Sequence, residues 1–217
     1  MLTEVSPAEN QRIKSQLLTN HWRIKDEWLT AALLQIKDQH QNAVGDELLK
    51  HLYCMLLESD LTRCGSGGLP PDCNQIERAI LPHPVVVQIE SCRDSSQSLQ
   101  EEQSQKQKNL RRNPGYSYKR TLSLRVTDGI QYCTCLELTA IPSLPTYPTP
   151  GCKFIMLSAA IRHGIFLLDR ESILFLGGSC QRCIDEQKTV DDMISSNLGW
   201  RISFFIIISS SLLTVTS

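Results

Sequence analysis

The sequence predicts an α+β fold in which three short helices pack on a small closed barrel of about five strands. Residues 7–62 repeat apolar side chains at helical spacing, whereas residues 120–178 alternate apolar and polar side chains as half-buried strands do. Turn-forming pairs such as Asp128-Gly129 separate the segments of the second region. At 217 residues, with 41% hydrophobic and 21% charged side chains, the chain has an ordinary globular composition and room for one large or two small domains.

The helical part contains three expected helices. The first begins at Pro7, because proline suits the first helical position, and we expect Asp26 to cap the second. The third covers about residues 44–56, and the glycines and prolines of residues 65–71 then end it and form a linker. A bundle this small has too little core to be stable alone, so we expect it to pack on the barrel.

The barrel part begins with a strand at residues 85–91. In the next strand Leu122, Leu124 and Val126 share one face, and Asp128-Gly129 predicts a hairpin after it. About five strands in about 90 residues suit a barrel of the oligonucleotide/oligosaccharide-binding (OB) kind. A weak helix at residues 180–194 closes the domain. The expected divisions are residues 1–68 (helical bundle), 69–195 (OB barrel with an insertion at 93–119) and 196–217 (an atypical apolar tail).

The insertion at residues 93–119 is polar almost throughout and offers hardly an apolar side chain to bury, so we expect a mobile loop. Its second half is cationic and contains two tyrosines: Lys106, Lys108, Arg111, Arg112, Lys119 and Arg120, with Tyr116 and Tyr118. Such a run is either a solvated charged segment or a contact for a partner. Its position between the first two strands favours a partner contact, because a protruding loop on a rigid barrel can reach another molecule.

Motifs of catalysis and metal binding are missing from the sequence. It has no Gly-rich phosphate loop, no His-Glu-x-x-His run and no nucleophile elbow, so we expect no enzyme and no catalytic residues. A zinc site would have to combine Cys180-x-x-Cys183 with Cys133-x-Cys135, but one pair falls on an expected helix and the other on an expected strand. Buried thiols are the better interpretation, and we expect no metal, cofactor or small-molecule substrate.

Neither the net charge nor the barrel face points to nucleic acid. The net charge is −1, and the only outward-facing cation that the pattern places on the barrel strands is Arg125. We therefore expect any DNA contact to be weak and to come from the basic loop. Residues 202–217 are apolar but fall short of the roughly 20 residues that a membrane-spanning helix needs, so membrane association is not expected.

Several motifs resemble those of the RecQ-mediated genome instability protein 1 family. In the helical part these are Trp22-Arg23-Ile24-Lys25 with Trp28-Leu29. The barrel part carries four further motifs in the family's order: Leu124-Arg125-Val126-Thr127-Asp128-Gly129, Glu137-Leu138-Thr139-Ala140-Ile141-Pro142, Pro150-Gly151-Cys152-Lys153, and Ile173 to Gly178. The resemblance covers about residues 20–190. Tudor domain-containing protein 3 shares the same bundle-plus-barrel arrangement and is the close alternative.

The resemblance implies a non-catalytic, nuclear scaffold that binds topoisomerase III and a RecQ-family (Bloom-type) helicase. Such a scaffold acts in the dissolution of double Holliday junctions during DNA repair and replication. By the same resemblance, the loop between the first two barrel strands inserts into the topoisomerase and modulates its DNA gate. The implied partner-binding residues are Arg111, Arg112, Pro114, Tyr116, Lys119 and, at the turn near the partner surface, Lys153. The resemblance extends neither to the family's second, C-terminal barrel nor to residues 202–217.

Overall fold

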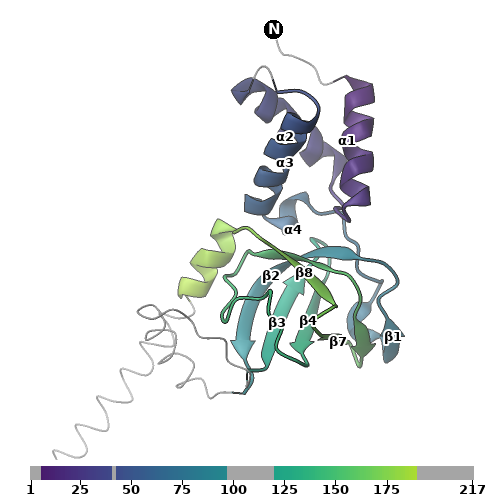
Figure 1. Cartoon of the computed structure of the whole chain (residues 1–217), viewed down its shortest axis with the longest axis vertical. Coiled ribbons are helices and arrows are strands. Elements are labelled where there is room, and N and C mark those ends of the chain that lie inside the picture. The colour runs from purple at the N-terminus through teal and green to yellow at the C-terminus, as the bar shows by residue number, and fades with distance from the viewer. Residues whose placement is uncertain (1–5, 41–42, 97–119, 190–217) are drawn as a thin grey trace, which may run out of the picture.

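The computed structural model describes residues 6–40, 43–96 and 120–189, and shows a layer of helices standing on a curled β-sheet (Figure 1). The helices are α1 (Pro7–Thr19), α2 (Asp26–Gln39), α3 (Asp46–Glu58), the short α4 (Leu61–Cys64), the 3₁₀ helix η1 (Cys73–Gln75) and a terminal helix over residues 181–189. The three expected helices are confirmed, and α4 and η1 are additions that lie just before and just after residues 65–71, the segment that the sequence marks as linker. The terminal helix agrees with the expectation as far as residue 189.

The N-terminus of α2 differs from the prediction. Asp26 was expected to cap the helix, but Lys25 occupies the capping position and Asp26 is the first residue of α2. The Asp26 carboxylate instead forms an ion pair with Lys14 Nζ of α1 at 2.8 Å. A carboxylate in the first helical turn still interacts favourably with the helix dipole.

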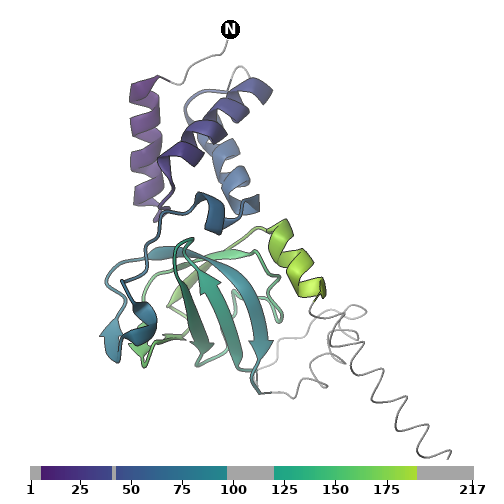
Figure 2. The same ribbon diagram turned by 180° about the vertical axis from the view of Figure 1, so that it is seen from behind.

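The bundle core is continuous with the sheet. Each of the three long helices buries one apolar stripe, with Ile13 and Leu17 from α1 against residues of α2 and α3. Val86 and Ile155, which belong to two strands, lie in the same buried cluster. The expectation that the bundle packs on the barrel is therefore confirmed, and the view from behind shows the helices seated on one end of the sheet (Figure 2).

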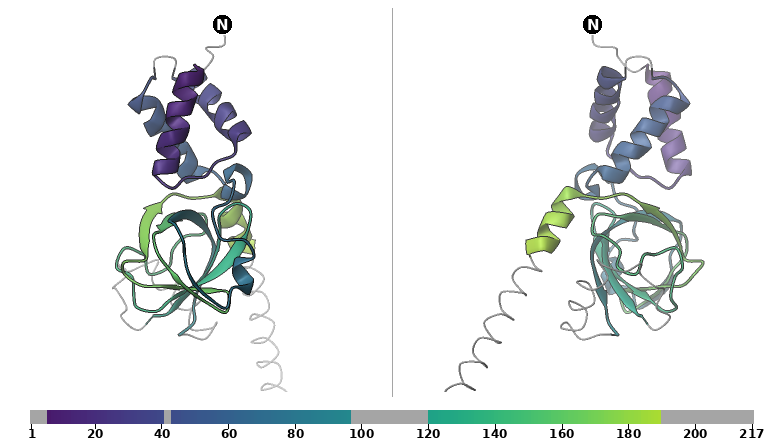
Figure 3. Two further views of the ribbon diagram at one scale, coloured as in Figure 1. Left: turned by 90° about the vertical axis from the view of Figure 1, so that its right-hand side faces the viewer. Right: turned by 60° about the vertical axis from the view of Figure 1, so that its left-hand side comes forward.

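The sheet has eight strands, not the expected five. They are β1 (Arg78–Ile80), β2 (Val85–Asp94), β3 (Leu122–Thr127), β4 (Tyr132–Glu137), β5 (Lys153–Met156), β6 (Ala160–Arg162), β7 (Ile165–Leu168) and β8 (Ile173–Gly177), in the order β1-β6-β7-β4-β3-β2-β5-β8. The sheet curls around one apolar core (Figure 3). It forms a half-barrel and not the closed barrel that was expected, because no strand pairing in the described residues joins β1 to β8. β1 and β6 account for two of the three additional strands, because each is only three residues long, too short for a period of two to be visible in sequence.

Hairpin pairing follows the predicted alternation. β3 and β4 pair antiparallel with Val126 opposite Cys133, and Asp128-Gly129 lies in the connection, where Gly129 has φ +97°. Strand β2 runs to Asp94, three residues beyond its expected end, so Arg93 and Asp94 belong to the sheet and not to the loop. No helix in the described ranges is long and apolar enough to cross a bilayer.

Candidate partner-binding site

Most residues of the predicted site lie outside the described part of the chain. These are Arg111, Arg112, Pro114, Tyr116 and Lys119, together with Lys106 and Lys108, because residues 97–119 are not described. Their role as partner contacts stays a prediction. The structure does describe the two ends of this segment, at residues 94–96 and 120–122, which we call the stem.

The stem is closed by hydrogen bonds centred on Asp94. Ser95 N donates to Thr121 O at 2.8 Å, so the chain leaves β2 and returns to β3 side by side. Asp94 Oδ1 accepts from Thr121 N at 3.1 Å and from both the backbone and the hydroxyl of Ser96, at 3.0 and 2.7 Å. Asp94 is buried. The two ends of the stem are therefore held at a fixed separation.

Arg120 anchors the returning end inside the protein. It was expected to be one of the cations of the loop, but its side chain is 2% exposed and forms a bidentate ion pair with Glu137 at 3.0 and 3.2 Å. Its remaining donors reach backbone oxygens after β4, including Pro145 O at 2.7 Å. The expectation was wrong because the sequence does not show that Arg120 pairs with a buried carboxylate, that of Glu137, 17 residues further along the chain.

Glu137 is equally well satisfied. One oxygen accepts from Arg120 and from Ile141 N, and the other from Arg120 and from Leu122 N. A buried ion pair persists when both partners have their hydrogen-bonding capacity filled, as here. The pair therefore fixes β3, the end of β4 and residues 141–145 in one rigid unit next to the stem.

Lys153 does not lie on a partner surface, contrary to the sequence expectation. The side chain is fully buried, and its Nζ donates to Leu57 O at 2.8 Å and to Gly151 O at 3.0 Å. Leu57 belongs to α3, so the lysine joins the bundle to β5. Burial lowers the pKa of Lys153. Lys153 therefore holds the bundle against the sheet. Any effect of Lys153 on a partner is indirect, through the relative position of bundle and sheet.

Four thiols lie near Lys153: Cys64, Cys152, Cys180 and Cys183. Burial raises the pKa of Cys64 to about 12 and also raises the pKa of Cys183. None of the nine cysteines, which all lie in the described ranges, forms a disulfide bond. Among the described residues, no group of three or more His, Cys, Asp or Glu side chains could hold a metal ion. Protonated, buried thiols of this kind are unreactive.

A network that the sequence did not reveal ties the terminal helix to the junction of bundle and sheet. Arg182 forms ion pairs with Asp60 at 2.6 Å and with Glu90 of β2 at 3.0 Å. Burial acts to raise the pKa of Asp60, but the hydrogen bonds from Arg182 and Gln88 outweigh it and lower that pKa. A cavity of about 370 Å³ opens beside this network, lined partly by Trp28 and Arg63. No motif spacing indicates these contacts, because the partners come from three separate elements.

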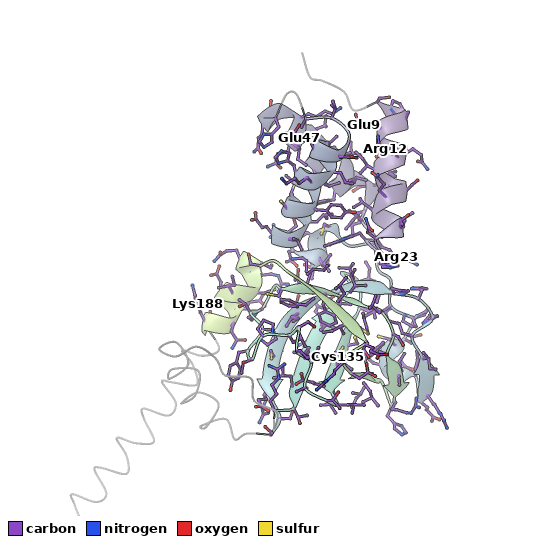
Figure 4. The ribbon with its side chains drawn as sticks, in the orientation of Figure 1. Glu9, Arg12, Arg23, Glu47, Cys135 and Lys188 are labelled. Carbon is purple, nitrogen blue, oxygen red and sulfur yellow. The ribbon has the colours of Figure 1, made fainter. Side chains whose placement is uncertain are left out.

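Asp128 holds the other side of the junction. One carboxylate oxygen accepts from Ile130 N and Gln131 N within its own turn. The second accepts from Gly68 N and Leu69 N at 2.7 and 2.8 Å. Figure 4 shows the side chains over the whole described structure, with Arg23 beside this junction, Cys135 in the sheet and Lys188 on the terminal helix. The linker and the hairpin are thus joined by hydrogen bonds to one buried carboxylate.

Comparison with known proteins connects this architecture with one family. The sequence model of the family described as "RMI1, N-terminal OB-fold domain" matches residues 69–190. The chain is 28% identical over 156 residues to RecQ-mediated genome instability protein 1 of Oryza sativa subsp. japonica, covering 72% of this chain and 18% of that protein. It is 27% identical over 198 residues to the protein of the same name from Danio rerio, covering 83% of this chain and 38% of that protein.

A second kind of relative matches the chain over a similar stretch. Tudor domain-containing protein 3 of Danio rerio is 26% identical over 191 residues, which is 86% of this chain and 24% of that protein. The chain spans 18% to 38% of the length of these relatives. The similarity concerns the bundle and the sheet, the two parts whose junction is described above.

Proposed function

The chain belongs to the RMI1 N-terminal OB-fold family, and we propose that it is a non-catalytic scaffold that joins topoisomerase III to a RecQ-family helicase. In this role it acts in the nucleus, where it stimulates decatenation and the dissolution of double Holliday junctions during DNA repair and replication. The family relation supports a role in genome stability, since three of its relatives are named for RecQ-mediated genome instability.

The observation that carries the proposal is the stem of the loop. Asp94, Arg120 and Glu137 hold both ends of residues 97–119 on a rigid barrel. The segment between them includes five cations and two tyrosines in residues 106–119. Cationic and aromatic side chains are well suited to contact a protein or a phosphate backbone, because arginine and tyrosine are enriched where binding energy concentrates.

The proposed mechanism is a shift in the gate equilibrium of the topoisomerase. A loop that contacts the open gate more favourably than the closed gate increases the open fraction by its differential affinity. A difference of about 1.4 kcal/mol between the binding free energies for the open and closed gates changes the ratio of open to closed enzyme tenfold. In this mechanism the bundle and the barrel bind the topoisomerase whether its gate is open or closed, and the loop contacts the gate itself.

The decisive experiment replaces residues 97–119 in the full chain with a short Gly-Ser linker. The stem hydrogen bonds lie outside the replaced residues, so we expect the variant to fold and to retain topoisomerase III in a pull-down. We expect its stimulation of decatenation to be lost. A matched control keeps the length and composition of the segment but scrambles its order. Undiminished stimulation by the linker variant would overturn the mechanism, and failure of the wild-type chain to retain the enzyme would overturn the proposed partner.

The similarity to tudor domain-containing protein 3 supports a second candidate, an adaptor dedicated to the beta paralogue of topoisomerase III. The two candidates differ in partner preference. Parallel pull-downs with the purified alpha and beta paralogues separate them: retention of beta alone favours the second candidate, and retention of alpha favours the first.

A further inference from the structure

A cavity of about 250 Å³ opens on the helical bundle, between α1, α2 and the first residues of the linker. Its apolar lining includes Leu17, Leu18, Trp22 and Leu29. Three of these side chains are buried, but Leu18 is 60% exposed and offers an apolar surface to a visitor. The volume lies below the roughly 300–1,000 Å³ of sites for small molecules and suits a single large side chain.

The end of α1 holds one wall of this cavity in place. His21 N donates to Leu18 O at 3.0 Å and Trp22 N donates to Leu17 O at 2.9 Å, which is the Schellman pattern of a helix C-terminus. His21 takes the left-handed conformation that this pattern requires, with a φ of 65°. Because backbone hydrogen bonds fix Leu17 and Trp22 relative to each other, this wall is already formed in the free protein.

The linker supplies the other wall and holds Arg23 at its edge (Figure 4). Ser66 N donates to Arg23 O at 2.9 Å and Lys25 N donates to Cys64 O at 2.8 Å, so the two backbone segments run side by side. The stem of Arg23 lies against Gly68, where an added Cβ atom would be 3.2 Å from Arg23 Cδ. Arg23 itself is exposed.

The indole N–H of Trp22 lacks an acceptor. Trp22 is 3% exposed, and its Nε1 donates to no group in the described part of the chain. The fully enclosed polar atoms without a partner in that part are Asn10 Oδ1 and His83 Nδ1, so Trp22 Nε1 is not fully enclosed. It therefore opens to the cavity that Trp22 lines. A largely buried indole N–H normally has a partner, and an acceptor on a bound molecule would supply it.

The charged residues at the cavity leave one cation without a counter-ion. Lys14, Arg23 and Asp26 are the charged residues of the lining. Lys14 Nζ pairs with Asp26 at 2.8 Å, whereas Arg23 forms no ion pair with any described residue. The rim of the cavity is therefore complementary to a carboxylate, which a guanidinium group binds with two parallel hydrogen bonds.

We propose that this cavity binds a peptide segment of a partner protein in which a leucine stands next to an acidic residue. The leucine side chain fills the apolar cavity, a peptide carbonyl accepts from the Trp22 indole N–H, and the neighbouring carboxylate pairs with Arg23. A peptide offers the apolar group, the neutral acceptor and the anion at three separate points, as the cavity requires. A fatty acid has an apolar chain and a carboxylate but no separate acceptor for the indole. The site is distinct from the loop of the proposed function.

The test adds acetyl-Asp-Leu-Asp-amide to the full chain and follows the indole N–H signals of its three tryptophans by ¹H–¹⁵N NMR. The signal that disappears in Trp22→Phe is that of Trp22. We expect it to move in a saturable way, with half-saturation at about 1 mM peptide. Acetyl-Asp-Gly-Asp-amide, which lacks the apolar side chain, should bind at least about tenfold more weakly.

The contact between Arg23 and the carboxylate is tested separately. Arg23→Gln should weaken the binding of acetyl-Asp-Leu-Asp-amide about threefold, the usual size for an exposed ion pair. The uncharged peptide acetyl-Asn-Leu-Asn-amide should bind the wild type and the Arg23 variant equally, because the pair is then already lost. A loss of the same size with both peptides would contradict the pairing of Arg23 with the carboxylate.

Matched controls separate this cavity from other sources of binding. Arg78→Gln removes an exposed arginine from β1 and should leave the affinity unchanged, and thermal unfolding of each variant checks the fold. A Trp22 signal that stays in place up to about 10 mM peptide would overturn the proposal. So would equal movement with acetyl-Asp-Gly-Asp-amide, or an equal affinity for octanoate, which would show that any amphiphilic anion enters. No topoisomerase is present, so the outcome is independent of the proposed scaffold role.

Discussion

The carboxylate of Glu137 is fully buried, so its charge depends entirely on the hydrogen bonds that it accepts. It has no exposed surface, and each of its two oxygens accepts hydrogen bonds from Arg120 and from one backbone N–H. Every donor that faces it is buried with it. Its removal would leave a buried guanidinium without a counter-charge, one of the few single changes that strongly destabilise a protein.

We expect Glu137→Gln to lower the free energy of unfolding by about 3 kcal/mol or more. The amide NH2 of glutamine would face two donors whichever way it turned, and the charge of Arg120 would be left unpaired. Urea unfolding of the full chain followed by circular dichroism measures the change. Glu171→Gln, in the exposed turn after β7, is the control and should shift stability by no more than about 0.5 kcal/mol. A Glu137 variant as stable as the control would contradict the assigned ion pair.

At the scale of elements, the β3–β4 turn is where the hairpin meets the bundle. A Cβ atom added to Gly129 would lie 2.4 Å from Leu61 O of α4 and 2.9 Å from the Cα of Gly65. Both neighbours are backbone atoms, so neither can turn away. The turn and the first residues of the linker therefore approach each other only because glycine stands at position 129.

Gly129→Ala should be distinctly more destabilising than Gly177→Ala. Both glycines have positive φ, at +97° and +79°, and alanine costs about 1–2 kcal/mol in such a conformation. Only at Gly129 is there also a steric clash, since nothing lies within 4 Å of a Cβ at Gly177. We expect about 1–3 kcal/mol of additional loss at Gly129. Equal unfolding midpoints in urea for the two variants would show that the bundle and the hairpin do not touch as described.

At the scale of the whole molecule, Asp60 connects three parts of the chain. It caps α4 through Thr62 N, accepts from Gln88 of β2 and pairs with Arg182 of the terminal helix. Its pKa is lowered in the folded protein, so folding favours its ionised form. This contribution to stability is fully present above the ordinary pKa of 3.8 and is lost as the pH falls below that value towards the lowered pKa.

Asp60→Asn should therefore lose about 1.5–3 kcal/mol of unfolding free energy at pH 7, the value of hydrogen bonds to a charged group. The difference between wild type and variant should shrink as the pH falls below 3.8, because the carboxyl of the unfolded wild type then takes up a proton while that of the folded protein, with its lowered pKa, stays ionised. Urea unfolding at pH 7, 5 and 3 measures this. Asp38→Asn, on the exposed side of α2, is the control. A difference that stayed constant over this range would refute the role of the Asp60 charge.

Sequence patterns predicted those elements of the fold that depend on residues close together in the chain. The apolar stripes of the three long helices and the alternation before Asp128-Gly129 depend on neighbours in sequence, and the helices and the hairpin are confirmed. The burial of Lys153 and Arg120 was missed because their partners, Leu57 O and Glu137, lie far away along the chain.

The closed stem has a consequence for how this protein can change. Ser95 and Thr121 are joined whatever number of residues lies between them, so insertions or deletions in the connection leave the barrel register intact. Doubling the length of such a connection costs only about 0.6 kcal/mol in closure entropy. The length of the connection between Ser95 and Thr121 can therefore change in evolution without loss of folding. The same connection can be lengthened by design to carry a probe or a crosslinking group.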